Sequence, residues 1–345
     1  MYTLGKPGYA VAAGVSPASS SNSQPTRLPL LQTAAIFCLY ELVNSATFHF
    51  VTKFDLRHED CIEGMSPLAD ESVDVVVTSP PYNLGITYGK YSDRQDRQSY
   101  LRWCHEWAEQ VRRILKPTGS FFLNIGAAPS NPMLPHEMVI ELRDLFVLQN
   151  TIHWIKSIAI EDRCSRRPVG DATRGQQLLP KGASHREAAT AIRSFGHFKP
   201  ISSKRFVNDC HEYVFHFTKT GRVELDRLSI GVPYQDKSNI ARWSHTRGSD
   251  LRCRGNTWFI PYQTIQSRAK ERPHPATFPV QLAELCIKLH GPAGAGRIQT
   301  MLDPFLGIGN SAVAAQRCSV KRFIGFEIDK GYLAEAKRRL ALCNQ

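Results

Sequence analysis

The sequence has no closely spaced pair of cysteines, and this absence excludes the commonest zinc and redox motifs. Its nine cysteines are an odd number, and no two of them form a Cys-x-x-Cys motif. The twelve histidines show no spacing typical of metal ligands either. We therefore expect no metal site, no disulfide framework and an intracellular, reducing compartment, which in a bacterium would be the cytoplasm or nucleoid.

A long uninterrupted apolar run is also missing. The apolar stretch that begins at Leu30 is interrupted by Gln32, Glu41 and Asn44, so it is a poor membrane span. The layout of a secretory signal is absent, and we expect no membrane partner. The Ser/Pro/Asn/Gln composition near the start predicts that residues 1–47 are a flexible N-terminal extension. An organelle transit peptide is the alternative, because no acidic residue precedes Glu41.

Acidic residues are scarce relative to basic ones. The chain has 43 Lys and Arg against 31 Asp and Glu, which gives a net charge of +12 and a pI near 9.3. Nearly all of this excess falls within residues 153–275, which hold 22 Lys and Arg against 11 Asp and Glu. Such a concentration indicates a surface for a polyanion, and nucleic acid before membrane. The alternative is an ordinary solvated basic surface.

From Phe54 onward the sequence alternates between strand and helix patterns. Strands are expected at 72–79, 119–126, 151–157, 298–303 and 322–329, and helices at 97–116, 132–146, 278–291, 311–320 and 332–342. Between these, 205–221 and 221–231 predict a hairpin-like pair of strands. The alternation predicts an α/β fold in which helices cover both faces of a parallel sheet.

The strand expected at 72–79 ends at two consecutive prolines. Proline cannot donate to a sheet ladder and it fixes φ, so Ser79-Pro80-Pro81-Tyr82 must be a stiff loop at a strand end. This loop holds a hydroxyl, a proline carbonyl and an aromatic ring in fixed positions. The alternative for the motif taken alone is a purely structural turn.

A glycine loop follows a stretch of apolar residues that leads to Asp303. Gly307 and Gly309 let backbone amides approach a ligand closely, and Glu327 lies twenty residues after Gly307, where it suits ribose hydroxyls. The loop has no lysine for phosphates, and Ala312 breaks the dinucleotide pattern Gly-x-Gly-x-x-Gly. After NTP and dinucleotide ligands are excluded in this way, the remaining ligand type is a nucleoside without a pyrophosphate. S-adenosylmethionine fits, because its ammonium suits the Asp303 carboxylate; a tight turn without a ligand is the alternative.

Both loops follow strands of the expected sheet. In a doubly wound sheet, ligands bind outside the carboxyl ends of the strands. We therefore expect the Ser-Pro-Pro-Tyr loop and the glycine loop to face one cleft, although they lie far apart in the sequence.

The order of the motifs resembles that of the DNA amino-methyltransferases in their β arrangement. "TSPPYN" comes first, then the basic region, then "HPATFP", "LDPFLGIGN" and "IGFEID". The stretches "HEDCIEGMSPLADESVDVVVTSPPYN" and "NDCHEYVFHFTKTG" resemble the family too, so that the resemblance covers about residues 55–345. It implies a Rossmann-like S-adenosylmethionine-dependent methyltransferase with circularly permuted motif order. Residues 48–345 would be the catalytic domain, with 155–270 as an inserted basic region that recognises the DNA target.

The resemblance also implies a role for each matching residue. Ser79 and the Pro80 carbonyl would accept hydrogen bonds from the target amine, in a loop stiffened by Pro81. Tyr82 would stack on the extruded base. The cofactor-binding residues would be Asp60, Cys61, His274, Phe278, Asp303, Phe305, Gly307, Gly309, Asn310 and Glu327. Two features depart from the family: Asn310 stands where threonine is usual, and residues 161–194 are unlike an ordinary recognition segment.

The first residue of the catalytic motif is the clue to the target base. In the family that the chain resembles, serine at this position mostly accompanies cytosine and aspartate mostly adenine. We therefore expect a site-specific methyltransferase that acts on N4 of cytosine in double-stranded DNA by base flipping. The alternatives are adenine N6, RNA or protein as the substrate, and a DNA-binding relative without catalysis. A monomer or homodimer with a cognate restriction endonuclease would fit this role.

Overall fold

The computed structural model describes most of the chain between residues 51 and 343. The described residues are 51–85, 91, 93–129, 131–156, 204–207, 209–234, 237, 240–242, 249–261, 277–291 and 298–343. The expected extension at 1–47 and the unusual stretch at 161–194 lie outside these residues. Among the helices within them, none has the length and apolar composition that crossing a membrane requires.

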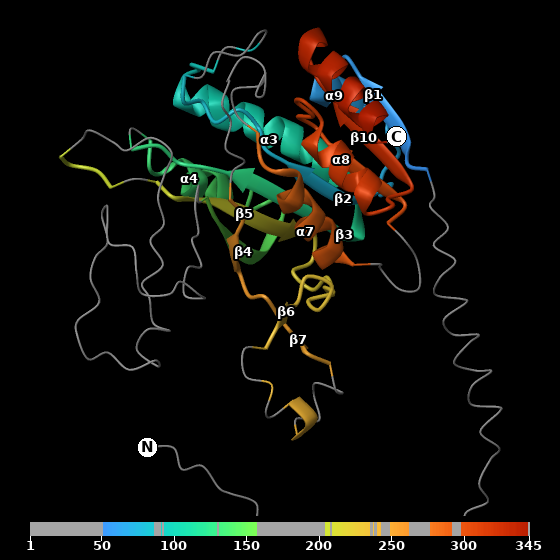
Figure 1. Cartoon of the computed structure of the whole chain (residues 1–345). Coiled ribbons are helices and arrows are strands. Elements are labelled where there is room, and N and C mark those ends of the chain that lie inside the picture. Colours follow the sequence, from blue (N-terminus) through green and yellow to red (C-terminus); the bar gives the residue numbers. More distant parts are fainter. Residues whose placement is uncertain are drawn as a thin grey trace, which may run out of the picture. The chain divides into compact units, whose positions relative to one another are not determined.

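Strands and helices alternate up to residue 155 and again from residue 280 onward, as the sequence pattern predicts, and the elements described between these parts are strands and one 3-10 turn (Figure 1). The strands are β1 (Lys53–Arg57), β2 (Val73–Thr78), β3 (Leu115–Ile125), β4 (Val147–Ile155), β5 (His211–Thr218), β6 (Val232–Pro233), β7 (Leu251–Arg252), β8 (Thr257–Phe259), β9 (Thr300–Asp303) and β10 (Arg322–Phe326). The helices are α2 (Cys61–Met65), α3 (Arg97–Ile114), α4 (Leu134–Glu141), α7 (Val280–His290), α8 (Asn310–Arg317) and α9 (Lys330–Leu342), with a 3-10 turn at η1 (Ile240–Arg242).

Helix α3 shows how the local sequence sets the ends of an element. Asp96 caps its start, because the carboxylate accepts a hydrogen bond from the Ser99 N–H at 3.1 Å. The helix ends where Leu115 becomes extended, two residues before Pro117, which could not continue an α-helix. Its buried side chains, Trp107 and Val111 among them, lie on one stripe.

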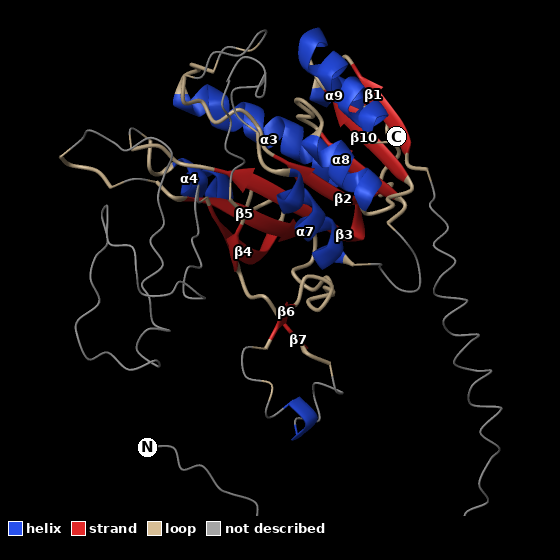
Figure 2. Ribbon diagram, viewed as in Figure 1, coloured by secondary structure: helices blue, strands red, loops and turns tan. Residues whose placement is uncertain are grey.

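The central sheet has eight strands in the order β1-β10-β9-β2-β3-β5-β4-β8. Figure 2 shows strands of this sheet in red with helices in blue beside them. Within this sheet, β5 pairs antiparallel with both of its neighbours, and the other pairs are parallel. The expected parallel sheet is therefore confirmed except at β5. Both β5 and β8 come from the stretch 155–270, so part of that stretch belongs to the sheet itself.

Helices cover both faces of the sheet, as predicted. Buried side chains of α7, α8 and α9 form one apolar cluster, and those of α2, α3 and α4 form another. Strand β2 serves both clusters: Val75 and Val77 pack into the first, whereas Val76 packs into the second. This alternation explains why the strand is apolar without interruption from Val75 to Val77.

The predicted hairpin is wrong at its second strand, because the described residues 222–231 contain no strand. Strand β5 already pairs with β3 on one edge and β4 on the other, so neither edge is left for a hairpin partner. The chain turns instead at Asp226, whose carboxylate accepts the N–H groups of Leu228 and Ser229 at 3.2 and 3.0 Å. Residues that look strand-like by composition are therefore excluded from the sheet by tertiary pairing.

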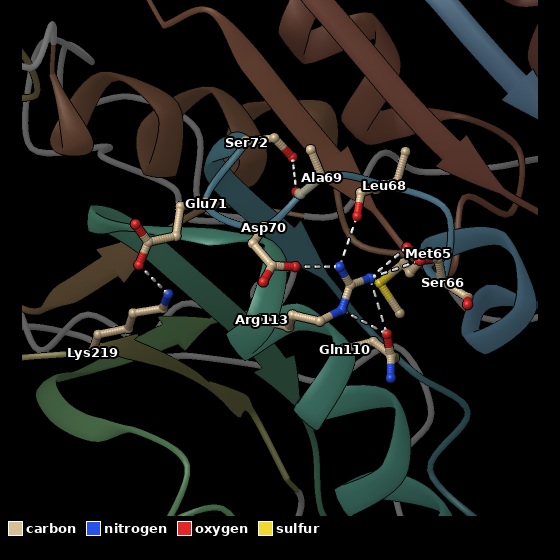
Figure 3. Close-up of polar contacts among 10 residues, drawn as sticks. All are labelled: Met65, Ser66, Leu68, Ala69, Asp70, Glu71, Ser72, Gln110, Arg113 and Lys219. Carbon is tan, nitrogen blue, oxygen red and sulfur yellow. Dashed lines mark hydrogen bonds and ion pairs between the residues drawn. The ribbon is translucent and has the colours of Figure 1, made fainter.

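Arg113 of α3 fastens the connection between α2 and β2 (Figure 3). Its guanidinium donates to the carbonyl groups of Met65, Ser66 and Leu68 at 2.8, 3.2 and 2.7 Å. It also pairs with Asp70 at 2.6 Å. One side chain thus donates to three carbonyl groups at the end of a short helix, and the Met65 carbonyl also accepts the Leu68 N–H at 2.9 Å.

Candidate active site

A pocket lies at the carboxyl ends of β2, β9 and β10. The segments that follow these three strands all contribute to its wall, together with the start of α2. This confirms that the Ser-Pro-Pro-Tyr loop and the glycine loop share one cleft. The predicted site residues that line it are Asp60, Cys61, Ser79, Pro80, Pro81, Tyr82, Phe278, Phe305, Gly307, Asn310 and Glu327.

Three predicted residues do not contribute to the described wall of the pocket. His274 lies outside the described residues. Gly309 is described but does not line the pocket; it has φ +80° at the start of α8, and a Cβ there would meet the Ala336 Cβ at 2.9 Å. Asp303 is 1% exposed and lies behind the wall.

Asp303 connects the two functional loops from within the core. One of its carboxylate oxygens accepts from the Thr78 hydroxyl at 2.6 Å and from the Phe305 N–H at 3.0 Å. The other accepts from the Ser311 hydroxyl at 2.5 Å. Burial raises the pKa of Asp303 to about 6, against the opposing effect of these hydrogen bonds. The contacts assign Asp303 to holding the ends of β2 and β9 together.

The catalytic-motif loop is fixed by contacts on both sides of the prolines. The Ser79 and Tyr82 hydroxyls are 2.8 Å apart, and the Tyr100 hydroxyl donates to the Pro81 carbonyl at 2.7 Å. After the motif, Asp93 accepts the backbone N–H groups of Asn83 and Leu84 at 2.7 and 3.0 Å. The stiffness expected from two prolines is therefore reinforced by neighbouring side chains.

Glu327 follows β10 and reaches the glycine loop. One carboxylate oxygen accepts the Gly307 N–H and the other accepts the Asp329 N–H, each at 2.8 Å. Burial raises the pKa of this carboxyl above its ordinary value, and the two backbone N–H groups oppose the change. Since a carboxylate oxygen can accept more than one hydrogen bond, Glu327 retains acceptor capacity toward the pocket that it lines.

Asn310 and Cys61 have local structural tasks. The Asn310 amide donates to the Phe278 carbonyl at 2.6 Å, and its oxygen accepts from Arg339 at 2.5 Å. This residue therefore ties the glycine loop to the segment before α7. Cys61 is buried, and burial raises the pKa of its thiol, so it contributes packing rather than a thiolate.

Several pocket residues were missed by the sequence interpretation. Trp103 of α3 and Tyr91 line the pocket, and the Trp103 ring lies 5.6 Å from that of Tyr91 and 5.5 Å from that of Phe305. Trp103 fits the apolar stripe of α3, so its spacing gave no sign of a second task. Glu59, directly before the predicted Asp60, was missed as well.

A polar cluster beside Ser79 was also missed. It consists of Asn124 at the end of β3, Glu212 at the start of β5 and Lys156 directly after β4. The sign in the sequence was Glu212, the one acidic residue in the strand "HEYVFHFT".

The chemistry of the pocket wall fits S-adenosylmethionine. The described lining residues include four carboxylates, Glu59, Asp60, Glu327 and Asp329, and no lysine or arginine. A pyrophosphate would be repelled by such a wall, whereas a cationic nucleoside is favoured. The rings of Trp103 and Phe305 add apolar surface and faces that attract a cation.

Comparisons with known proteins agree with this geometry. The Type II methyltransferase M.ScaI of Streptomyces caespitosus is 26% identical over 300 residues, which cover 83% of this chain and 80% of that protein. The DNA adenine methyltransferase YhdJ of Escherichia coli is 23% identical over 289 residues, which cover 82% of this chain and 81% of that protein.

The solved structure of PvuII DNA methyltransferase (cytosine-N4-specific) covers 84% of this chain and 87% of its own, with a TM-score of 0.53 and 21% identity. This likeness confirms the expected Rossmann-like α/β fold. The family model described as DNA methylase matches residues 73–338, which include both functional loops. The chain therefore belongs to the DNA methylase family.

Proposed function

We propose that this DNA methylase transfers a methyl group to N4 of cytosine in double-stranded DNA, at Ser79-Pro80-Pro81-Tyr82. The observation that carries the proposal is the shared pocket. Ser79 and Tyr82 line it together with Gly307 and Glu327. The residues that would hold the target amine and the residues that would bind the methyl donor are thereby brought to one place.

Ser79 and Pro80 supply the acceptors that the chemistry needs. The lone pair of an aromatic amine is delocalised into the base, so the amine is a weak nucleophile. Two fixed acceptors beside the NH₂ group would rotate it out of the ring plane and free its lone pair for attack. The contacts of Tyr100 and Asp93 keep the loop in place while charge develops, as preorganised catalysis requires.

S-adenosylmethionine is the methyl donor of this family. When bound, it supplies a methyl group already activated by its positively charged sulfur. We assign Glu327 to its ribose hydroxyls, since this carboxylate lines the pocket beside the glycine loop. Asp60, Phe305 and Gly307 would line its adenosine and methionine parts. Asp303 is assigned to the loop junction instead of the ammonium, because its oxygens bind Thr78, Phe305 and Ser311.

Tyr82 offers an aromatic face for a base that has left the duplex. The ring is partly exposed and lines the pocket next to Ser79. An exocyclic amine inside a double helix cannot reach such a pocket unless the nucleotide is flipped out. Stacking on Tyr82 would compensate part of the cost of unstacking that base.

The choice of cytosine rests on Ser79. A serine hydroxyl is neutral, and among proteins that this chain resembles it mostly accompanies cytosine-N4 methylation. One fold neighbour is named cytosine-N4-specific, whereas one relative is named an adenine methyltransferase. Adenine N6 is therefore the second candidate, with the same acceptors and the same donor. The relatives named Type II methyltransferase also suggest a cognate restriction endonuclease.

Methyl transfer from labelled S-adenosylmethionine to duplex DNA tests the proposal. We expect the wild-type chain to label DNA and not RNA of the same sequence. Ser79→Ala should lower kcat by roughly 10²-fold, as the removal of one preorganised hydrogen bond does elsewhere. Its affinity for S-adenosylmethionine should be unchanged. Equal labelling by wild type and Ser79→Ala would remove Ser79 from the reaction.

A further inference from the structure

Lys156 and Glu212 form a largely buried ion pair, which hydrogen bonds connect to the Ser79 hydroxyl through Tyr82. The Lys156 Nζ atom lies 2.7 Å from Glu212 Oε1, and each side chain is 11% exposed. Burying two charges is costly unless further hydrogen bonds satisfy the donors and acceptors that the ion pair itself does not use. The partners of the second carboxylate oxygen therefore show what the pair is connected to.

The second oxygen of Glu212 connects the ion pair to the catalytic loop. Glu212 Oε2 accepts from Asn124 Nδ2 at 2.7 Å and from the Tyr82 hydroxyl at 3.1 Å. Asn124 Nδ2 also donates to the Tyr82 oxygen at 2.7 Å. The amide orientation of Asn124 follows from its surroundings, because the reverse would set an amide oxygen against a carboxylate.

The direction of the Tyr82 proton follows from these contacts. Tyr82 has one hydroxyl proton, and the described residues place three oxygens close enough to accept it: Ser79 Oγ at 2.8 Å, Glu212 Oε2 at 3.1 Å and the backbone carbonyl of Asn124 at 3.3 Å. The carboxylate is the strongest acceptor of the three, because it is charged. With the Tyr82 proton directed to Glu212, the hydrogen bond between Tyr82 and Ser79 is made by the serine proton. A lone pair of Ser79 Oγ then remains for the pocket.

We propose that Glu212, held by Lys156, is a positioning residue that fixes the Ser79 hydroxyl as a hydrogen-bond acceptor, acting through Tyr82. The proposal rests on the function proposed above, in which Ser79 accepts from the target amine. A free serine hydroxyl donates as readily as it accepts, and donation toward an N–H group would be unproductive. The chain of hydrogen bonds from Glu212 through Tyr82 to Ser79, which we call the relay, removes this ambiguity. It also gives the Tyr82 hydroxyl a function of its own, because stacking on a base requires only the ring.

A double-mutant cycle with Tyr82→Phe and Glu212→Gln tests the relay. Tyr82→Phe keeps the aromatic face and removes the hydroxyl. Glu212→Gln keeps the shape but offers an amide that can donate toward Tyr82, which releases the Tyr82 proton toward Ser79. Each variant should lower kcat roughly tenfold, and KM for DNA and the affinity for S-adenosylmethionine should stay unchanged. Because both act through one hydroxyl, the double variant should be no slower than the slower single variant.

Controls separate a relay from a loss of structure. Glu284→Gln on α7, which removes the charge of a carboxylate paired with Arg317, should retain wild-type kcat. Thermal unfolding shows whether Glu212→Gln is folded. If it is not, the cycle of Tyr82→Phe with Ser79→Ala decides: Tyr82→Phe should slow the wild type and have no further effect in Ser79→Ala.

Effects that multiply in either cycle would overturn the relay, and so would a folded Glu212→Gln variant with wild-type kcat. Both results presuppose a wild-type chain that methylates DNA. A folded wild type that transfers no methyl group to DNA would contradict the proposed function, and the relay with it.

Discussion

Glu327 binds the glycine loop and faces the pocket at the same time. Its two backbone contacts leave acceptor capacity for a ligand, which is why we assign it to the ribose. Glu327→Ala should weaken S-adenosylmethionine binding by about 1–3 kcal/mol, because the ribose would lack its hydrogen-bond acceptor. Isothermal titration calorimetry without DNA measures this, with Glu335→Ala on α9 as the control. Unchanged affinity would exclude Glu327 from the cofactor site.

His216 and His290 form a buried pair on either side of Ser120. The Ser120 hydroxyl lies 3.0 Å from His216 Nε2 and 2.9 Å from His290 Nδ1. Burial lowers the pKa of His216 to about 3 and that of His290 to about 4. Between these values and about 6.5, the ordinary pKa of histidine, the unfolded chain binds more protons than the folded one. Both histidines therefore destabilise the fold as pH falls through this window.

We predict that the free energy of unfolding decreases as pH is lowered from about 6.5 toward 4, by about 1.4 kcal/mol per pH unit for each histidine. Asp303 opposes this, because its raised pKa makes the folded chain hold a proton over part of the same window. Urea unfolding of wild type and His290→Gln at several pH values isolates one histidine. The free energy of unfolding of the variant should depend less steeply on pH than that of the wild type. An equal dependence on pH in both proteins would contradict the prediction.

At the scale of elements, Arg113 joins α3 to the connection between α2 and β2 (Figure 3). Arg113→Ala would remove the donor that the Ser66 and Leu68 carbonyl groups share, whereas the Met65 carbonyl would keep the Leu68 N–H. We expect a decrease of about 1–3 kcal/mol in the free energy of unfolding, measured by urea denaturation. Arg338→Ala on α9 is the matched control, since Arg338 pairs with Glu335 at the surface and should change stability by less than about 0.5 kcal/mol. Similar decreases in both variants would refute the special role of Arg113.

Elements whose signals are local could be predicted from the sequence. Helix α3 was predicted at 97–116 and spans Arg97–Ile114, because its cap and its apolar stripe are encoded within the segment. Two of the three strand ends that form the pocket, those of β2 and β9, were placed by prolines and glycines, which act locally too.

Features that depend on distant pairing could not be predicted in this way. Strand β5 lies between β3 and β4 and opposes their direction, and no pattern within "HEYVFHFT" specifies that place. The cluster of Asn124, Lys156 and Glu212 exists because that pairing brings the ends of three strands together. For the same reason, sequence alone assigned the buried Asp303 to a ligand and not to Thr78, its partner on the neighbouring strand β2.

At the scale of the whole molecule, the basic stretch 155–270 remains our proposed DNA-recognition region, apart from the strands that it lends to the sheet. Its described residues include the exposed Arg222, Arg227 and Arg252. Affinity for DNA should fall linearly with salt on a log-log plot. Replacing these arginines with glutamine should make the slope shallower by about 0.9 for each phosphate that the protein no longer neutralises. Arg338→Gln should leave the slope unchanged, and equal slopes in all variants would place the DNA elsewhere.

Methylation of an exocyclic amine at the Ser79 pocket is tested most directly by nucleoside mass spectrometry. Duplex DNA would be incubated with S-adenosylmethionine and either the wild-type chain or Ser79→Ala, then digested to nucleosides. We expect N4-methylcytosine with the wild type and roughly 10²-fold less with the variant. N6-methyladenine in its place would change the base and leave the site standing. DNA that carries neither modified base, or the same amount with both proteins, would contradict the proposed site.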